Sequence, residues 1–475
     1  MRRQCRFLIL SLVCMVCLSV AGSVSAAAPG PGGKVQERVF QRLQDQGRAR
    51  VLIRVRENGD ARPGADTARR TENRLSWIDR RERLMTRLSR RAEGRVRSFR
   101  RMPFLAMEVD QAGLQDLVDS EDVAAIYEDK LHEPVLSSSG PVIGSDIAHA
   151  NGYTGSGALV AVLDTGVHVG HELFAGKTVV EACFSTNYAP HGAVSLCPNG
   201  GEVQYGPGAA RPCSLGGCDH GTHVAGIAVG DGRATGEPSG VAPDAGLVAI
   251  QVFSEFNGSD VLTYTSDFVA AMEYVLDLKV LHGYNIASVN LSVGGDPACT
   301  AYECDFYQSG VSAEKYAVDL LKNAGIATVA AAGNSGNANG ISSPGCVSGA
   351  VGVGASTDSD TVASYSNRGS WLTMFAPGSS IRSSTSAPAG YGYKSGTSMA
   401  TPQVAGALAV LKSAAGDAAL SSANDVDRLV ATLIQDSPEI FDSATGRHYP
   451  RFQLDDALSY VESGALAVDL ILDSD

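Results

Sequence analysis

Three side chains that can transfer protons or attack a carbonyl follow one another along the sequence. Asp164 closes the apolar run ALVAVLD, His220 opens HGTHVAG, and Ser398 lies in SGTSMATPQVAG. A serine hydroxyl becomes a strong nucleophile when a base accepts its proton, and imidazole can accept and return a proton near neutral pH. A carboxylate can fix the tautomer of that imidazole and stabilise its charged form. The three residue types together indicate nucleophilic catalysis.

The sequence around Ser398 predicts the start of a buried helix. Small and aliphatic residues from Gln403 onward suit a helix that is packed on most sides. Pro402 has no amide hydrogen, so we expect it near a helix start, where the first amides have no carbonyl partner. Ser398 would then lie beside unpaired amides and the positive end of the helix dipole. That position suits a nucleophile, and it equally suits an N-cap serine, which is the more frequent role for such a residue.

The elements that must position these residues form an alternating pattern after residue 140. Short apolar runs rich in Val and Ala are separated by helical stretches such as SDFVAAMEYVLDL and EKYAVDLLKNAG. Fully apolar strands between helices predict a mostly parallel sheet covered on both faces, which is a three-layer α/β/α domain. In such sheets functional groups collect at the carboxyl ends of strands, where Asp164 and Asn334 would lie. The expected strands span 158–164, 246–253, 286–293, 326–333 and 349–356.

The sequence before residue 140 predicts a smaller α+β unit. Its strands are expected at 50–56, 104–110 and 123–129, with a long charged helix around 66–98 and a second helix at AGLQDLVDS. This order is typical of a split βαβ-like sandwich. The segment 28–135 has four more basic than acidic side chains, whereas the chain from 136 onward has twenty more acidic than basic ones. Opposite charges indicate two units that attract each other.

Composition excludes several classes of protein. The chain has 475 residues, of which 44% are hydrophobic and 19% charged, so neither a disordered chain nor a fibre is indicated. A net charge of −13 argues against nucleic acid as a partner, because phosphate binding requires a basic face. We interpret the arginine-rich stretch around 66–98 as a solvated helix face. We expect a monomer.

The first 26 residues have the pattern of a secretory signal peptide. MRRQCR is basic, FLILSLVCMVCLSVAG is apolar, and VSA ending at Ala26 suits cleavage. A retained anchor is the alternative, although the apolar run is short for a membrane-spanning helix. No later stretch is apolar enough to cross a membrane. We therefore expect export to the extracellular space or a periplasm, with no membrane span after signal removal.

Export affects how the cysteines are interpreted. Cys213 and Cys218 are separated by four residues, and so are Cys299 and Cys304, in glycine-rich or polar loops. In an oxidising compartment each pair is expected to form a small loop disulfide. A zinc site built from the same pairs is the alternative.

Three further cysteines follow the signal peptide. Cys183 with Cys197 would make a third disulfide, although exchange with the Cys213 and Cys218 pair is an open alternative. Cys346 has no evident partner in the sequence. We expect it to be a buried thiol that packs like a small hydrophobic residue.

These motifs resemble those of the subtilisin-like serine proteases, the subtilase or S8 family. VAVLDTGV around Asp164, HGTHVAGI around His220, AAAGN at Asn334 and GTSMATPQVAG around Ser398 match the family's motifs in order. The order Asp, His, Ser is that of subtilisin, whereas α/β-hydrolases have the order Ser, Asp, His. The resemblance covers about residues 143–460.

The resemblance also implies a domain organisation. Residues 50–130 resemble the family's I9-like inhibitory propeptide, so a small ferredoxin-like prodomain is expected before the catalytic domain. The implied boundaries are a signal peptide over 1–26, a propeptide over 27–135, a catalytic domain over 136–465 and a short tail over 466–475.

The family's catalytic roles transfer residue by residue. Ser398 would attack the scissile carbonyl, His220 would take and return the proton, and Asp164 would orient His220. Asn334 would donate its side-chain amide to the developing oxyanion, together with the backbone N–H of Ser398. His223 forms H-x-x-H with His220, but no third ligand motif follows, so a structural role is expected.

Substrate binding and maturation are also implied by the resemblance. Ser292, Val293, Gly294 and Gly295 would form an edge strand that pairs with the backbone of a protein or peptide substrate, which gives broad specificity. The chain's own propeptide would be cut within KLHEPVLSSSG and would remain bound as an intramolecular inhibitor. No cofactor is implied for the chemistry. Calcium dependence is expected from the resemblance alone, with no ligands named.

Two other functions would use the same residues. A peptide ligase or cyclase would resolve the acyl-enzyme with an amine instead of water. A catalytically idle binding protein would keep the scaffold only. Because Asp164, His220, Asn334 and Ser398 are all retained, an endopeptidase is the better prediction.

Overall fold

The computed structural model describes residues 34–57, 67–88, 96–134, 141–300, 304–307, 310–416 and 420–464. The predicted signal peptide over 1–26 and the predicted tail over 466–475 lie outside the described residues. The same is true of residues 135–140 in the predicted connector. The proposed domain boundaries therefore stay predictions.

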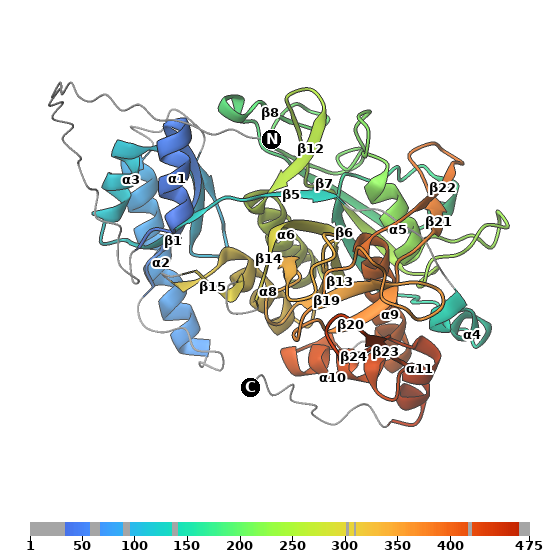
Figure 1. Cartoon of the computed structure of the whole chain (residues 1–475). Coiled ribbons are helices and arrows are strands. Elements are labelled where there is room, and N and C mark those ends of the chain that lie inside the picture. The colour runs from blue at the N-terminus through green and yellow to red at the C-terminus, as the bar shows by residue number, and fades with distance from the viewer. Residues whose placement is uncertain are drawn as a thin grey trace, which may run out of the picture.

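The predicted parallel sheet is the centre of the larger part of the molecule (Figure 1). Its order is β20-β19-β17-β13-β6-β10-β7-β9, and every neighbouring pair is parallel except β7 with β9. All residues of the central strands are buried, as expected for a sheet covered on both faces. The strands are β6 (Leu159–Asp164), β7 (Val179–Phe184), β9 (Val203–Tyr205), β10 (Gly246–Gln251), β13 (Ile286–Leu291), β17 (Ala327–Ala331), β19 (Val351–Ser356) and β20 (Met374–Pro377).

Helices cover the two faces of this sheet and complete the predicted three layers. Val160 and Val162 of β6 belong to a core shared with α5 (His220–Val229) and α9 (Thr397–Ala415). The alternating residues, such as Ala161 and Leu163, belong to a second core with α6 (Thr265–His282) and α8 (Ala313–Asn323). The α/β/α architecture is thereby confirmed.

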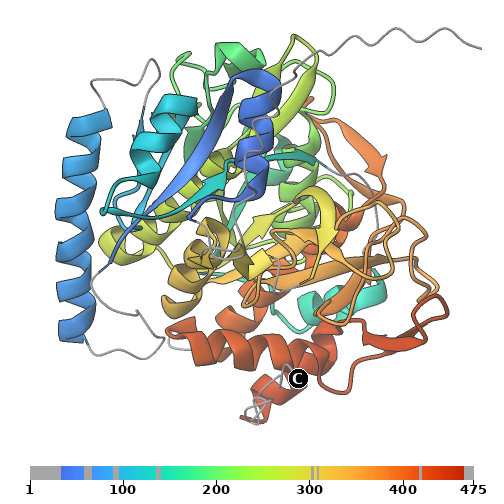
Figure 2. The ribbon, with the colours of Figure 1, turned by 60° about the vertical axis from the view of Figure 1, so that its left-hand side comes forward.

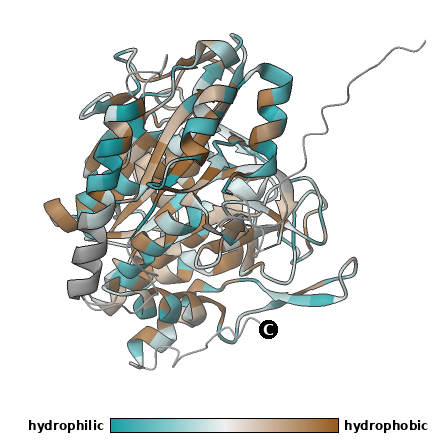
Figure 3. Ribbon diagram, turned by 90° about the vertical axis from the view of Figure 1, so that its left-hand side faces the viewer, coloured by the Kyte–Doolittle hydropathy of each residue, from teal (hydrophilic) through white to brown (hydrophobic). Residues whose placement is uncertain are grey.

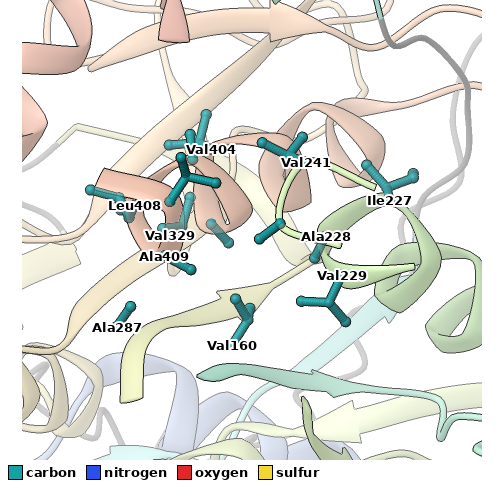
Figure 4. Close-up of a cluster of buried hydrophobic side chains, with 14 of the residues drawn as sticks. Val160, Ile227, Ala228, Val229, Val241, Ala287, Val329, Val404, Leu408 and Ala409 are labelled. Carbon is teal, nitrogen blue, oxygen red and sulfur yellow. The ribbon is translucent and has the colours of Figure 1, made fainter. Parts of the chain in front are cut away.

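Small side chains allow α5 and α9 to lie close together and close to the sheet. Figure 4 shows Val160 of β6 below Val404 and Leu408 of α9, with Ala228 of α5 beside them. At Gly406, an added Cβ would come within 2.8 Å of the Ala228 carbonyl oxygen, so only glycine fits this crossing. The small residues of α5 and α9 therefore have a packing reason at this crossing.

A second sheet contains the strands that border the candidate site. Its order is β18-β14-β5-β12-β11-β8. The central member, β5, comes from the segment before residue 135, and it pairs antiparallel with both β12 and β14. The strands are β5 (Leu131–Pro134), β8 (Ala193–Ser195), β11 (Ser254–Phe256), β12 (Asp260–Tyr264), β14 (Val293–Cys299) and β18 (Ile341–Ser343).

The N-terminal unit has the predicted ferredoxin-like fold. Four antiparallel strands in the order β2-β3-β1-β4 and the helices between them give the chain order βαββαβ. The predicted helix around 66–98 is too long, because α2 ends at Leu88 and residues 97–98 form the edge strand β2 on β3. The elements are α1 (Glu37–Gln46), β1 (Arg48–Val55), α2 (Thr67–Leu88), β2 (Arg97–Ser98), β3 (Phe104–Asp110), α3 (Gln111–Val118) and β4 (Val123–Glu128).

The sheet of the N-terminal unit is apolar on both faces. Val51 and Ile53 belong to a core beneath the unit's own helices, along which hydrophobic and hydrophilic residues alternate (Figure 3). Leu52, Phe104 and Tyr127 belong instead to the core that contains α6 and α8. One face of this sheet is therefore buried against the larger part of the molecule, on the side of α6 and α8 (Figure 2).

Ion pairs surround that contact. Arg97 of β2 lies 2.5 Å from Asp267 at the start of α6, and both Arg100 and Arg101 pair with Asp277 of the same helix. The basic N-terminal unit thus meets an acidic helix, as the charge distribution of the sequence indicates.

The disulfides agree only in part with the prediction. Cys183–Cys197 and Cys213–Cys218 are present as predicted. The predicted Cys299–Cys304 pair is wrong, and so is the prediction that Cys346 is a thiol, because Cys304 is bonded to Cys346. The loop after β14 and the loop after β18 are neighbours in space, although the two cysteines are 42 residues apart. The disulfides also exclude a zinc site built on the Cys213 and Cys218 pair.

The remaining described elements lie around these layers. They are α4 (Ser145–Ala150), α10 (Ala423–Ile434), α11 (Leu454–Glu462), β15 (Phe306–Tyr307), β16 (Gly310–Val311), β21 (Ile381–Ser384), β22 (Tyr391–Lys394), β23 (Glu439–Asp442) and β24 (Arg447–Pro450), with short 3-10 turns at Pro141–Ile143, Glu172–Phe174 and Ala189–His191. Among the described helices, none combines the length and the apolar character that a membrane span requires.

Candidate active site

Asp164 and His220 form a buried hydrogen-bonded pair. Asp164 is the last residue of β6 and His220 is the first residue of α5, and both are fully buried. The Nδ1 atom of His220 lies 2.6 Å from Oδ1 of Asp164. The backbone N–H of Thr165 donates to the same oxygen at 2.7 Å, which fixes the carboxylate. Because a carboxylate only accepts, Nδ1 carries the hydrogen, and Nε2 is left as the acceptor that a general base needs.

Ser398 lies on the first turn of α9, which begins at Thr397. The predicted helix start close to Ser398 is confirmed, but the N-cap is Gly396, so the alternative role of Ser398 as an N-cap is wrong. Pro402 lies inside the helix and cannot donate to the carbonyl of Ser398, four residues earlier. The Ser292 hydroxyl donates to that carbonyl instead, at 2.8 Å.

The hydroxyl of Ser398 also contacts Ser292. Its Oγ donates to the backbone carbonyl of Ser292 at 3.0 Å, so in this conformation it does not donate to His220. Helices α5 and α9 pack against each other, and His220 and Ser398 lie on the first turns of these two helices. Attack therefore requires a rotation of the Ser398 hydroxyl toward the imidazole. Hydrogen bonds between catalytic groups often tighten only once substrate is bound.

Asn334 is oriented by the residue that precedes Ser398. Its Oδ1 accepts from the backbone N–H of Thr397 at 3.0 Å and from the Thr397 hydroxyl at 3.1 Å. These donors identify the oxygen of the amide, so the NH₂ group points away from Thr397. The Thr397 hydroxyl oxygen also accepts from the backbone N–H of Gly333 at 3.1 Å. One threonine thus connects the end of β17 with the start of α9.

The chain must turn sharply at Gly333 to present Asn334. Gly333 has φ +94°, and an added Cβ would come within 2.2 Å of the Ser342 hydroxyl and 2.5 Å of Nδ2 of Asn367. Both the conformation and the space therefore require glycine. In the sequence AAAGN, the alanines lie at the end of the strand, the glycine forms the turn and the asparagine supplies the hydrogen-bond donor.

We expect Asn334→Ala to lower kcat about 10²–10³-fold, because one donor to the developing oxyanion is removed, a magnitude known for a subtilisin. KM should change little, since that donor acts mainly in the transition state. Steady-state peptide hydrolysis by the matured variant would measure both constants. Asn339→Ala, an exposed asparagine of the same loop, is the matched control and should keep wild-type kinetics. Equal kcat values for Asn334→Ala and wild type would contradict the assigned role.

The predicted substrate strand is paired on both sides. Val293 lies opposite Pro134 and Gly294 lies opposite Glu133 in β5, while Gly295 lies opposite Ser343 in β18. Ser292, just before this strand, makes the two hydrogen bonds with Ser398. The end of β5 therefore approaches the carbonyl to which the Ser398 hydroxyl donates.

Sequence reasoning missed the supporting contacts made by Thr397 and Ser292. Thr397 precedes a predicted site residue, and Ser292 was predicted only as part of the substrate strand, so their contacts with Asn334 and Ser398 come from the structure alone. His223 has the expected structural role, since its Nε2 is hydrogen-bonded to the Gly392 carbonyl at 3.1 Å. Burial lowers the pKa of His223 to about 3, so this imidazole is neutral.

Calcium binding is expected from the resemblance to the family alone. Within the described residues, no three His, Cys, Asp or Glu side chains gather in a way that could hold a metal ion. We therefore assign no calcium ligands among the described residues.

Comparison with known proteins gives an independent result. Residues 155–449 match the Subtilase family, peptidase S8. Subtilisin E of Bacillus subtilis (strain 168) is 32% identical over 324 residues, which cover 67% of this chain and 72% of that protein. An alkaline protease of Alkalihalobacillus alcalophilus is 30% identical over 322 residues, 67% of this chain and 71% of its own length. A thermophilic serine proteinase of Bacillus sp. (strain AK1) is 34% identical over 258 residues, 54% of this chain and 53% of that protein.

Proposed function

The chain belongs to the subtilase family of serine endopeptidases, and we propose that it is a secreted member, made as a precursor that cleaves itself with Asp164, His220 and Ser398. The observation that carries this proposal is strand β5, which pairs antiparallel with β12 on one side and β14 on the other, in the place that an extended substrate would take. The hydrogen bond between Asp164 and His220 supports the assigned chemistry.

The proposed reaction begins with attack on the scissile carbonyl. The Ser398 hydroxyl turns from the Ser292 carbonyl, gives its proton to Nε2 of His220, and forms a bond from Oγ to the carbonyl carbon. Asp164 stabilises the resulting imidazolium. The NH₂ group of Asn334 and the backbone N–H of Ser398 donate to the oxyanion.

The remaining steps release the two products. The tetrahedral intermediate collapses with cleavage of the carbon–nitrogen bond, and His220 returns the proton to the leaving amine. Water then attacks the carbonyl carbon of the acyl-enzyme while His220 takes a proton from that water. The bond from this carbon to Oγ of Ser398 breaks, His220 gives the proton to Oγ, and the carboxylate product leaves. In a peptide ligase an amine would take the place of this water. The overall reaction as we propose it is hydrolysis.

The pairing of β5 supports a particular processing bond. Antiparallel pairing places Pro134 opposite Val293, and Ser292 is the residue that precedes Val293 in the sequence. The next residue of the chain would be the one facing Ser292, whose carbonyl accepts from the Ser398 hydroxyl. We therefore propose cleavage between residues 135 and 136, at the predicted end of the propeptide.

The test is the mass of the products from a precursor expressed without residues 1–26. We expect a mature chain that begins at Leu136, and two product masses that sum to the precursor plus one water. A sum without the water would indicate ligation or cyclisation instead of hydrolysis. A mature chain that begins outside 130–140 would contradict the assignment of β5 as the bound substrate strand.

Protein and peptide substrates follow from family membership. Export to the extracellular space or a periplasm, inhibition by the retained prodomain, calcium dependence and a monomeric state remain parts of the proposal. The contact of the N-terminal unit with α6 supports inhibition, because β5 of the same segment pairs with both β12 and β14 and so takes the place of a substrate strand.

A further inference from the structure

An apolar cluster lies beside β5 and outside the catalytic residues. Tyr188, Phe256 and Tyr264 are buried in it, and the side chain of Leu131 at the start of β5 packs against it together with Leu262. Ala193 of β8 is its other buried member. All of these residues except Leu131 belong to the catalytic part of the chain.

Strand pairing fixes the shape of this cluster. Leu131 pairs with Tyr264, and Leu262 lies two residues before Tyr264, so all three side chains lie on one face of the second sheet. On that same face, Phe256 of β11 lies opposite Ala193 of β8. The Cys183–Cys197 disulfide closes the segment that contains Tyr188 and β8. Apart from Leu131, the residues of this cluster therefore all come from the chain after the prodomain, and the disulfide holds part of them in place.

A cavity of about 530 Å³ adjoins Leu131. One side is formed by prodomain residues such as Arg42 and Arg50, and the other by catalytic-part residues that include His191, Phe256 and Tyr264. Release of the prodomain would remove the first side and leave the second. The remaining wall would then be open to the side chain of a substrate.

We propose that this wall, formed by Tyr188, Phe256, Leu262 and Tyr264, is a substrate subsite for a branched aliphatic side chain at the fifth residue before the cleaved bond. This inference rests on the proposed processing bond, since Leu131 is the fifth residue before a cut after residue 135. Two prodomain side chains contact the wall in the precursor, because the Arg50 guanidinium lies 5.3 Å from the ring centre of Tyr188 and 4.5 Å from that of Tyr264, and Leu131 packs beside them. Of these two, only Leu131 belongs to the strand that a substrate would replace, so its side chain identifies the occupant. With this subsite, a substrate side chain five residues before the cleaved bond affects the rate of cleavage, in addition to the backbone hydrogen bonds nearer to that bond.

The test uses two quenched fluorescent peptides and the matured wild-type enzyme. One peptide carries LHEPVLSSSG, and in the other alanine replaces the leucine. We expect the leucine peptide to have a kcat/KM about five to ten times higher, because three buried carbon atoms are lost in the alanine peptide. Mass spectrometry must place the cut between the valine and the leucine that follows it in both peptides.

Two variants make the test specific to the wall. Leu262→Ala should reduce the preference for leucine to about twofold or less, because part of the apolar wall is gone. Val194→Ala is the matched control. Val194 lies on β8 next to Ala193 of the cluster, but its side chain points to the opposite face of the sheet and is 52% exposed. The preference of this variant for leucine should therefore match that of the wild type.

Each outcome has a distinct meaning. Equal cleavage of both peptides by wild type, or an unchanged preference in Leu262→Ala, would overturn the subsite and leave the proposed protease function standing. Cleavage that moves to another bond would overturn it in the same way. If neither peptide were cleaved by a matured enzyme, the proposed function itself would be contradicted.

Discussion

A Ser398→Ala precursor should remain whole under conditions in which the wild-type precursor splits into prodomain and catalytic domain. The variant keeps the Asp164 and His220 pair and the oxyanion donors, but it has no oxygen that could form the acyl-enzyme. In a subtilisin, a member of the same family, loss of the nucleophile costs about 10⁶-fold in kcat. A self-cleavage reaction slowed to that extent would not be visible within days. Intact mass over time measures it.

Two controls separate lost chemistry from lost structure. Ser413→Ala removes a hydroxyl from the same helix, where it donates to the Ser156 carbonyl, and it should be processed like wild type. Thermal unfolding should show that Ser398→Ala is folded, since the Ser292 hydroxyl still has the residue 398 carbonyl as its acceptor. Splitting of Ser398→Ala at the wild-type rate would mean that another protease makes the cut.

Asp164→Asn should slow self-processing by about 10⁴-fold, the magnitude found when the same change is made in a Ser-His-Asp triad. The amide has the shape of the carboxylate but carries no charge to stabilise the imidazolium. If its NH₂ group faces His220, it donates to Nδ1, so the imidazole hydrogen is placed on Nε2 and this nitrogen can no longer accept the serine proton. The first-order rate of precursor cleavage, followed by mass, measures the effect.

The matched control for this change is Asp358→Asn. Asp358 is an exposed aspartate just beyond the carboxyl end of β19, so it tests the same substitution near the same edge of the sheet. Its processing rate should match wild type within about twofold, as is usual for surface changes. A processing rate for Asp164→Asn within tenfold of wild type would contradict the role of Asp164.

The sequence contained enough information to predict the layers of the fold and the element ends at or near which Asp164, His220 and Asn334 lie. Val and Ala runs between helices identify buried parallel strands, since only a sheet covered on both faces is apolar on both. Asp164, His220 and Asn334 were predicted at strand or helix ends because the short motifs around them mark those ends. Pro402 correctly located the helix start, although the stretch around Ser398 could not by itself distinguish a nucleophile from an N-cap, and the other motifs were needed to assign Ser398 as the nucleophile.

Features that depend on contacts between distant segments could not be predicted. The partner of Cys304 is Cys346, and only the pairing of β14 with β18 makes the two segments neighbours. The edge strand β2 has no strand pattern of its own, and its pairing with β3 determines its conformation. The orientation of Asn334 by Thr397 likewise depends on how α9 meets the end of β17.

Labelling with a fluorophosphonate tests the central claim most directly, because this reagent reacts with serine hydroxyls that a neighbouring base activates. The matured wild-type enzyme should gain one label, and digestion should locate it on the peptide that contains Ser398. Heat-denatured enzyme should gain none, since Asp164 and His220 no longer activate the hydroxyl. A label on another residue, or no label on an enzyme that hydrolyses peptides, would contradict the assignment of Ser398 as the nucleophile.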